Sequence, residues 1–203
     1  MKTPPFPAKG EIELSCSAYR CDELQLVGIE KTNSAVLARC LAAEEGGEDL
    51  VSELQTHYQP RFDDSGRRDR FGFLIEVGGR IAGLTMLTIA SWEQRCGYTS
   101  ADILPLFRGR RIAARSKEIL FQLGFVELGL DFIEIRCALD NQASKCSLEH
   151  TPGLRLIGVA EASASRSGSP EYVYVLTKPE WENHYRREGV QGLQRSSPIA
   201  HKK

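Results

Sequence analysis

The segment from Ile103 to Ala113 holds the residue types best suited to bind a reactive ligand. It reads Ile-Leu-Pro-Leu-Phe-Arg-Gly-Arg-Arg-Ile-Ala and joins the end of a predicted strand to the start of a long predicted helix. A helix N-terminus presents peptide N–H groups without intrahelical partners and the positive end of the helix dipole. Arg108, Arg110 and Arg111 add cationic donors there. The combination favours an anionic ligand, most naturally a pyrophosphate. A basic turn that simply begins a helix is the alternative interpretation.

A second segment, from Phe132 to Ser144, also carries polar groups at a strand end. The predicted strand ends in Asp140-Asn141, and Ser144 follows three residues later. Asn and Ser at such positions often cap a helix, so capping alone is one interpretation. The other is that Asn141 and Ser144 bind a ligand held beside the first segment.

The spacing of apolar residues predicts the elements that position these two segments. Helices are expected at 22–29, at 33–44 with Asn33 as a cap, at 48–58, at 110–128 and at 141–149. Strands are expected at 11–19, 71–77, 80–92, 96–104, 132–139, 154–160 and 172–177, with Gly78-Gly79 as a hairpin turn. Residues 61–70 are expected to form a charged loop, and 163–169 a Ser-rich loop. This order predicts an α+β protein whose helices cross a mostly antiparallel sheet.

Composition limits the classes of protein that the chain can belong to. Its 203 residues, 41% hydrophobic and 26% charged, suit one domain, expected at 11–181 between a Pro-rich lead at 1–10 and a polar tail at 182–203. The net charge of −1 argues against strong nucleic-acid binding, and no apolar run is long enough to span a membrane. The six cysteines form no C-x-x-C pair and the four histidines are scattered, so reduced thiols and no metal are expected. Because no signal peptide is recognisable, a cytoplasmic location is expected.

Taken together, residues 71–177 resemble the GNAT superfamily of N-acetyltransferases. The Ile103–Ala113 segment is similar to that family's pyrophosphate loop, and the Phe132–Ser144 segment to its second signature in the RimJ/RimL branch. The resemblance implies a GNAT-like fold and acetyl-CoA, or another acyl-CoA, as co-substrate. It implies an enzyme that transfers the acyl group to a primary amine of a peptide, a protein or a small molecule. By analogy it also implies a homodimer as one arrangement.

The resemblance also implies roles for individual residues. The backbone at Ile103 and Leu104 would pair with the pantetheine arm of CoA, Asn141 would hydrogen-bond that arm, and Ser144 would protonate the leaving thiolate. The pyrophosphate would be held by the loop residues Arg108, Gly109, Arg110, Arg111, Ile112 and Ala113. Asp102, just before the loop, could accept the amine proton, or be a solvated strand carboxylate. Trp92 and Tyr98 could line the acceptor pocket, or pack in the core.

Two residues depart from the family pattern. Arg111 stands where the family has a glycine that lets the backbone approach phosphate, and we favour an outward side chain that adds a charge. Leu148 stands where many members carry the tyrosine that protonates the thiolate, which leaves Ser144 as the candidate acid. These departures support an alternative function, a catalytically silent domain that binds CoA or a protein partner as a sensor or scaffold.

Overall fold

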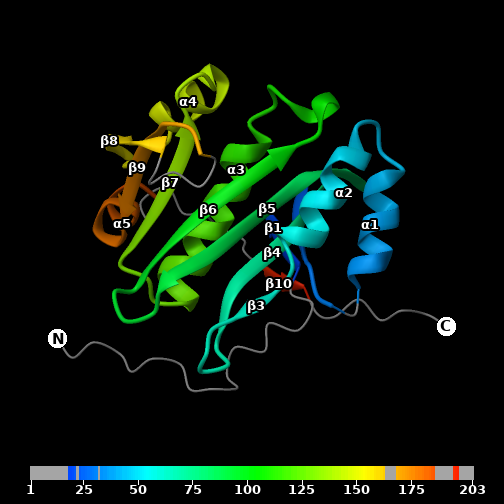
Figure 1. Ribbon diagram of the computed structural model, residues 1–203, viewed down its shortest axis with the longest axis horizontal. Coiled ribbons are helices and arrows are strands. Elements are labelled where there is room, and N and C mark those ends of the chain that lie inside the picture. Colours follow the sequence, from blue (N-terminus) through cyan, green and yellow to red (C-terminus); the bar gives the residue numbers. More distant parts are fainter. Residues whose placement is uncertain (1–17, 22, 32, 163–167, 186–193, 197–203) are drawn as a thin grey trace.

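The computed structural model describes residues 18–21, 23–31, 33–162, 168–185 and 194–196. Within these ranges the strands form one ten-stranded sheet of order β10-β1-β2-β4-β5-β6-β7-β9-β8, with β3 paired to β4 (Figure 1). The strands are β1 (Ala18–Cys21), β2 (Leu24–Gly28), β3 (Arg61–Phe62), β4 (Arg68–Val77), β5 (Arg80–Ser91), β6 (Cys96–Ile103), β7 (Phe132–Ala138), β8 (Arg155–Ala160), β9 (Glu171–Thr177) and β10 (Gln194–Ser196). The mixed, mostly antiparallel sheet confirms the predicted fold class.

The helices lie mostly in the expected places. They are α1 (Ser34–Ala42), α2 (Gly47–Thr56), α3 (Ile112–Gln122), α4 (Gln142–Glu149) and α5 (Lys178–Tyr185). A 3₁₀ turn at Pro105–Phe107 precedes α3, and a π-helical turn at Leu123–Glu127 extends it close to the predicted end. Gly78 and Gly79 both have positive φ, as the predicted two-residue hairpin between β4 and β5 requires.

One parallel strand pair interrupts the antiparallel sheet. β6 and β7 pair in parallel from Cys96 opposite Phe132 to Thr99 opposite Ile135, and α3 supplies the crossover between them. Beyond Thr99, β6 pairs only with β5, and beyond Ile135, β7 pairs only with β9. The two strands therefore separate over their last residues, and each presents an edge that no strand of the described chain covers.

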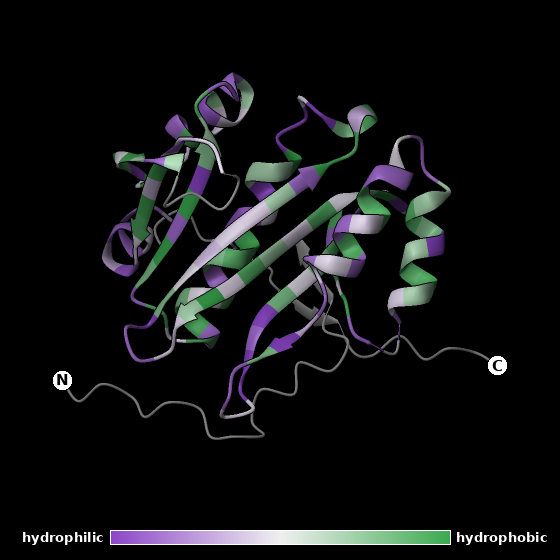
Figure 2. Ribbon diagram, in the orientation of Figure 1, coloured by the Kyte–Doolittle hydropathy of each residue, from purple (hydrophilic) through white to green (hydrophobic). Residues whose placement is uncertain are grey.

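Helices cover both faces of the sheet. Figure 1 shows α1 and α2 on one face and α3 on the other. A Cβ atom added to Gly124, in the π-helical turn, would contact Leu87 and Ile133, which places these strand residues on the α3 face. Because side chains alternate along a strand, Ser100 and Asp102 lie on the opposite face, where both contact the Tyr58 hydroxyl just after α2. Figure 2 shows hydrophobic residues along β5 and α3, between these layers.

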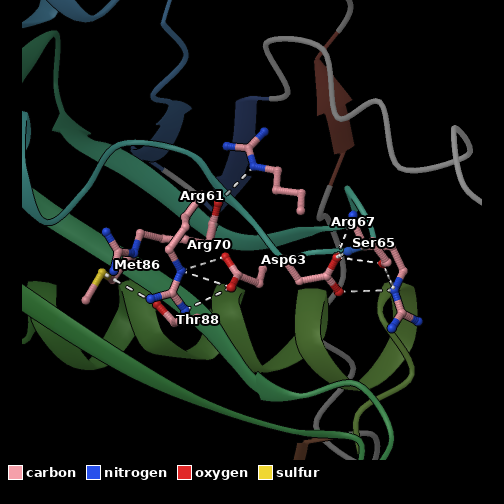
Figure 3. Close-up of polar contacts among 9 residues, drawn as sticks. Arg61, Asp63, Ser65, Arg67, Arg70, Met86 and Thr88 are labelled. Carbon is pink, nitrogen blue, oxygen red and sulfur yellow. Dashed lines mark hydrogen bonds and ion pairs between the residues drawn. The ribbon is translucent and has the colours of Figure 1, made fainter.

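The charged run at 61–70 is a hairpin rather than the predicted loop. β3 pairs with the start of β4, and the guanidinium of Arg61, which is labelled in Figure 3, binds both carboxylate oxygens of Asp69 at 2.9 Å. Arg68 is buried and pairs with Glu30 at 2.6 Å. Both charges are therefore paired with an opposite charge. This pairing lets β4 extend through a segment whose many charged residues predicted a solvent-exposed loop.

Residues 22–29 form strand β2, so the predicted helix there is wrong. Leu24, Leu26 and Gly28 are buried and the residues between them are not, the alternation of a strand with one covered face. Pairing with β4 supplies the hydrogen bonds that a short helix would have supplied internally. Long-range pairing thus outweighs local helix preference in this segment.

Three other predicted features differ from the structure or lie outside the described residues. Asn33 precedes α1, but its side chain does not cap the helix. It hydrogen-bonds the Glu30 N–H and the Gly28 carbonyl, which come before it in the chain. Within the polar tail expected at 182–203, Gln194–Ser196 forms an edge strand that pairs with β1. The predicted segments 1–10, 11–17 and 163–167 lie outside the described residues.

Within the described ranges, no helix is both long and apolar enough to cross a membrane. The same ranges contain no group of three or more His, Cys, Asp or Glu residues placed to hold a metal ion.

Gly83 controls how closely β5 approaches the end of β6. A Cβ atom there would lie 2.1 Å from the Asp102 carbonyl oxygen, whereas a Cβ atom at Gly158 would meet nothing within 4 Å. The two glycines have φ of 155° and 157°. We expect Gly83→Ala to lower the free energy of unfolding by about 2 kcal/mol more than the matched Gly158→Ala. Urea denaturation measures both, and equal losses would contradict the close approach.

Candidate functional site

A cavity of about 610 Å³ opens where β6 and β7 separate. Its walls come from the end of β6, the loop before α3, the first turns of α3, and α4. The lining residues are Ala101, Asp102, Ile103, Phe107, Arg108, Gly109, Arg111, Ile112, Ala113, Lys117, Asn141, Ala143, Ser144, Cys146 and Ser147. The structure thus brings together the two segments that the sequence singles out, although about thirty residues separate them along the chain.

Most of the predicted site residues line this cavity. They are Asp102, Ile103, Arg108, Gly109, Arg111, Ile112, Ala113, Asn141 and Ser144. Leu104 instead packs in the core and donates its N–H to the Ala82 carbonyl, while Arg110 lies 5.7 Å from the ring centre of Phe107. The Ile103 carbonyl accepts a hydrogen bond from Arg108 Nε at 3.0 Å. The peptide edge left open for a ligand strand therefore lies before Ile103, at Ser100–Asp102.

Trp92 and Tyr98 do not line the cavity. Trp92 is buried just after β5, where the Arg67 guanidinium lies 5.5 Å from its ring centre. Tyr98 lies opposite Glu134, in the stretch where β6 and β7 are still paired. Both residues lie toward the closed end of the strand pair, so the structure does not bring them to the predicted acceptor pocket.

The loop before α3 turns sharply at two residues. Gly109 and Arg111 both have left-handed backbone, with φ of 74° and 58°. Arg111 is the N-cap of α3, so the N–H groups of the first turn, from Ile112 on, point out of the helix toward the cavity. The Arg111 side chain is exposed and makes no hydrogen bond or ion pair with any described residue. This agrees with an outward side chain that adds a charge.

Asn141 caps α4 and orders Ser144. Its Oδ1 accepts the Ser144 N–H at 3.0 Å, so the capping interpretation of these residues is confirmed. Asn141 lines the cavity, and its Nδ2 has no hydrogen-bond partner among the described residues. The Ser144 hydroxyl hydrogen-bonds the Cys137 thiol, whose pKa is raised by burial and lowered in part by that bond. Ser144 is therefore held at the cavity wall by its backbone and its side chain.

Asp102 is fixed on the opposite wall by a buried phenol. The Tyr58 hydroxyl donates to Asp102 Oδ2 at 2.6 Å, and Ser100 lies 3.5 Å from the same hydroxyl. Burial first, and the Asp102 charge second, hold the pKa of Tyr58 well above its ordinary value. Asp102 itself is exposed. It is therefore an oriented carboxylate that solvent and a ligand can reach.

Sequence reasoning missed several lining residues, and Lys117 is the most informative. Lys117 is buried on α3, and burial lowers the pKa of its ammonium, while the charges of Cys137 and Asp102 partly offset that effect. A lysine on an amphipathic helix is ordinarily placed on the solvent side. One signal could have found it: Lys117 follows Ala113 by four residues and so shares its face of the helix.

Several solved structures share this fold. A protein from T. thermophilus, named provisionally as an acetyltransferase, is 18% identical, with a TM-score of 0.64 over 84% of this chain and 94% of its own. RimL, the ribosomal L7/L12 alpha-N-protein acetyltransferase in complex with coenzyme A, is 15% identical, with a TM-score of 0.59 over 79% and 97%. Spermidine/spermine N-acetyltransferase SpeG from Vibrio cholerae is 16% identical, with a TM-score of 0.58 over 80% and 97%. No protein-family model and no curated protein sequence matches the chain. These likenesses show that the chain has the GNAT acetyltransferase fold.

The left-handed backbone at Arg111 generates a stability prediction. Such backbone costs a non-glycine residue about 1–2 kcal/mol, and more for a β-branched one. We expect Arg111→Gly to leave the free energy of unfolding unchanged or raise it by up to about 1 kcal/mol, because the entropy cost of glycine offsets part of the relief. Arg111→Val should lower it by about 1–2 kcal/mol. Urea denaturation of the three proteins measures this, and a large loss in Arg111→Gly would mean that the side chain packs structurally.

The Tyr58 phenol generates a pH prediction. Its pKa is higher in the folded than in the unfolded chain, so its contribution to stability is complete below about pH 10 and is lost as the pH rises through the folded value. Tyr58→Phe should remove a slope of up to about 1.4 kcal/mol per pH unit from the alkaline side of the stability curve. The control is Tyr172→Phe, which should keep that slope. Urea denaturation at stepped pH measures it, and identical curves for Tyr58→Phe and the unsubstituted protein would contradict the assignment.

Proposed function

We propose that the protein is an acyl-CoA-dependent N-acyltransferase that transfers an acyl group to a primary amine. The observation that carries the proposal is the cavity at the separation of β6 and β7, which joins an open strand edge, a left-handed loop with two cavity-lining arginines, and an oriented serine. The fold supports the same conclusion, because RimL is solved with coenzyme A in a structure of this shape.

The loop and the strand edge would bind the two halves of CoA. The N–H groups at the start of α3, with Arg108 and Arg111, suit the pyrophosphate. The open edge of β6 at Ser100–Asp102 can pair with the amide groups of the pantetheine arm, as an added strand would. The arm would then run toward Thr99, where the strands meet, and Asn141 Nδ2 would hydrogen-bond it from α4.

The chemistry needs an unprotonated amine and a proton for the departing thiolate. The amine nitrogen attacks the thioester carbonyl, the carbon–nitrogen bond forms and the carbon–sulfur bond breaks. Asp102, oriented by the Tyr58 hydroxyl, would accept the proton that the amine loses, directly or through water. Ser144, ordered by Asn141 and Cys137, would donate a proton to the sulfur. Holding both reactants in one cavity supplies much of the rate, because it makes the encounter intramolecular.

The acceptor is proposed only as a class. RimL is named for a protein N-terminus and SpeG for spermidine and spermine, so this fold serves both protein and small amines. The resemblance to the RimJ/RimL branch favours a peptide or protein amine here.

One observation favours the second candidate, a silent domain that binds CoA without turning it over. Leu148, where a tyrosine is common in the family, is 1% exposed and packs in the core. It can supply no proton, so catalysis depends on Ser144 or on another donor of the cavity wall. A domain that had lost catalysis would keep the loop and the cavity and would lack only the group that donates a proton to the thiolate.

Heat measured on titration of CoA and acetyl-CoA into the purified chain tests binding, and thiol release over a panel of amines tests turnover. We expect dissociation constants on the order of micromolar, weakened about tenfold for both ligands by Arg111→Ala. Ser144→Ala should keep the binding and lower turnover about a hundredfold or more, whereas Ser52→Ala on the exposed side of α2 should change neither. Binding without turnover for every amine would favour the silent domain, and absence of CoA binding would overturn the proposal.

A further inference from the structure

Lys117 is a buried lysine that the proposed chemistry leaves without a role. It lies on α3, is 8% exposed, and lines the cavity. Lysine is almost never this buried unless it is paired. Among the described residues its ammonium has no hydrogen-bond or ion-pair partner. Its Nζ is not among the fully buried polar atoms of the described residues that lack a partner, so the cavity reaches it, and an anion bound there would offset the cost of burying the charge.

The groups around Lys117 do not supply that anion. The thiol of Cys137 and the carboxylate of Asp102 are close enough to influence it, yet neither is in contact with it. Asp102 is committed to the Tyr58 hydroxyl at 2.6 Å. Ser144 hydrogen-bonds the Cys137 thiol. The ammonium therefore faces the cavity, and burial lowers its pKa until an opposite charge arrives.

The position of Lys117 along α3 separates it from the pyrophosphate loop. It follows Ile112 by five residues, which is about 7.5 Å along the helix axis. The charges of CoA lie at its nucleotide end, beside the loop, and its pantetheine arm is uncharged. Lys117 lies within electrostatic range of Cys137, whose thiol contacts Ser144, the residue proposed to lie beside the thioester sulfur. A bound acyl-CoA can bring a negative charge to this part of the cavity only on its acyl group.

We propose that Lys117 binds the terminal carboxylate of the donor's acyl group, so that the protein transfers a dicarboxylic acyl group, of the succinyl or glutaryl class, to its amine acceptor. This inference rests on the proposed acyl-CoA function and names its donor. In this transfer the amide bond forms, the carbon–sulfur bond breaks and the thiolate takes a proton. The distal carboxylate takes no part in the bond changes. In the acylated product, this carboxylate leaves a negative charge where the acceptor amine had a positive one.

A matched pair of unreactive donor analogues isolates the carboxylate. S-carboxypropyl-CoA and S-butyl-CoA are thioethers of similar length that cannot transfer their chains. Titrated into the full chain with heat detection, S-carboxypropyl-CoA should bind about tenfold more tightly than S-butyl-CoA, as expected for a hydrogen bond to a charged group. Lys117→Met should remove that difference and keep the affinity for S-butyl-CoA. Lys145→Met is the control, since Lys145 lies on α4 beside Glu149 and outside the cavity lining, and it should keep the preference.

The comparison within the unsubstituted protein decides the inference even if Lys117→Met fails to fold. Equal affinities for the two thioethers, with CoA itself binding, would overturn the inference and leave the acyltransferase proposal standing. Failure of CoA and both thioethers to bind would overturn both. Mass spectrometry after incubation with acetyl-CoA adds a second readout: an acetyl group found on Lys117 would make this lysine an internal acceptor and would overturn its role as a carboxylate binder.

Discussion

The separation of β6 from β7 is the constraint on which the rest of the site depends. Peptide groups in the middle of a sheet are ordinarily paired, and leaving them unpaired is costly. Here the parallel pairing stops at Thr99 and Ile135, and each strand keeps only its outer neighbour. The open edge can be satisfied by water or by an extended ligand with amide groups of its own. The parallel pairing also requires a crossover, and α3 provides it. The same helix thus connects the two strands, begins at the loop of Arg108–Arg111 and contributes Lys117 to the cavity lining.

The charges of the site follow from this geometry. Arg108 and Arg111 lie at the cavity mouth, where solvent reaches them and where a pyrophosphate would be held without burying a charge. Lys117 lies deeper, where an unmatched charge is penalised. Asp102 stands on the other face of the sheet, turned toward Tyr58. One end of the cavity is therefore suited to the charged nucleotide portion of CoA, its middle to the uncharged arm, and its depth to a ligand that carries an anion.

The parts of the fold that sequence can predict are those governed by local signals. The hairpin at Gly78-Gly79, the alternation along β5 and β6, and the apolar stripe of α3 each specify their element without help from distant residues. β2 cannot be predicted in this way, because its apolar residues fit a helix as well as a strand and only pairing with β4 decides between them. The charged run at 61–70 suggests a solvated loop because its ion partners, Glu30 among them, are remote or come from the opposite strand. Lys117 escapes sequence reasoning for the same reason: burial of a charge is a property of the cavity, which the sequence does not display.

Arg111 and Leu148 show which features of the family pattern the chain retains. Arg111 stands where the family pattern has a glycine, and it has the left-handed backbone that glycine adopts most readily, so the loop gains a cation at that position. At Leu148 the side chain is apolar and buried, so the proton donor must be sought among Ser144, Ser147, Cys146 and Lys117 on the cavity wall, or in water. If Lys117 binds a carboxylate, its ammonium is held by that ion pair and is a poor source of the proton. Ser144, ordered by the Asn141 cap and the Cys137 thiol, then remains the donor with the best-defined position. In the proposed reaction, donor specificity and proton transfer would thus rest on two different helices, α3 and α4, which both line the cavity.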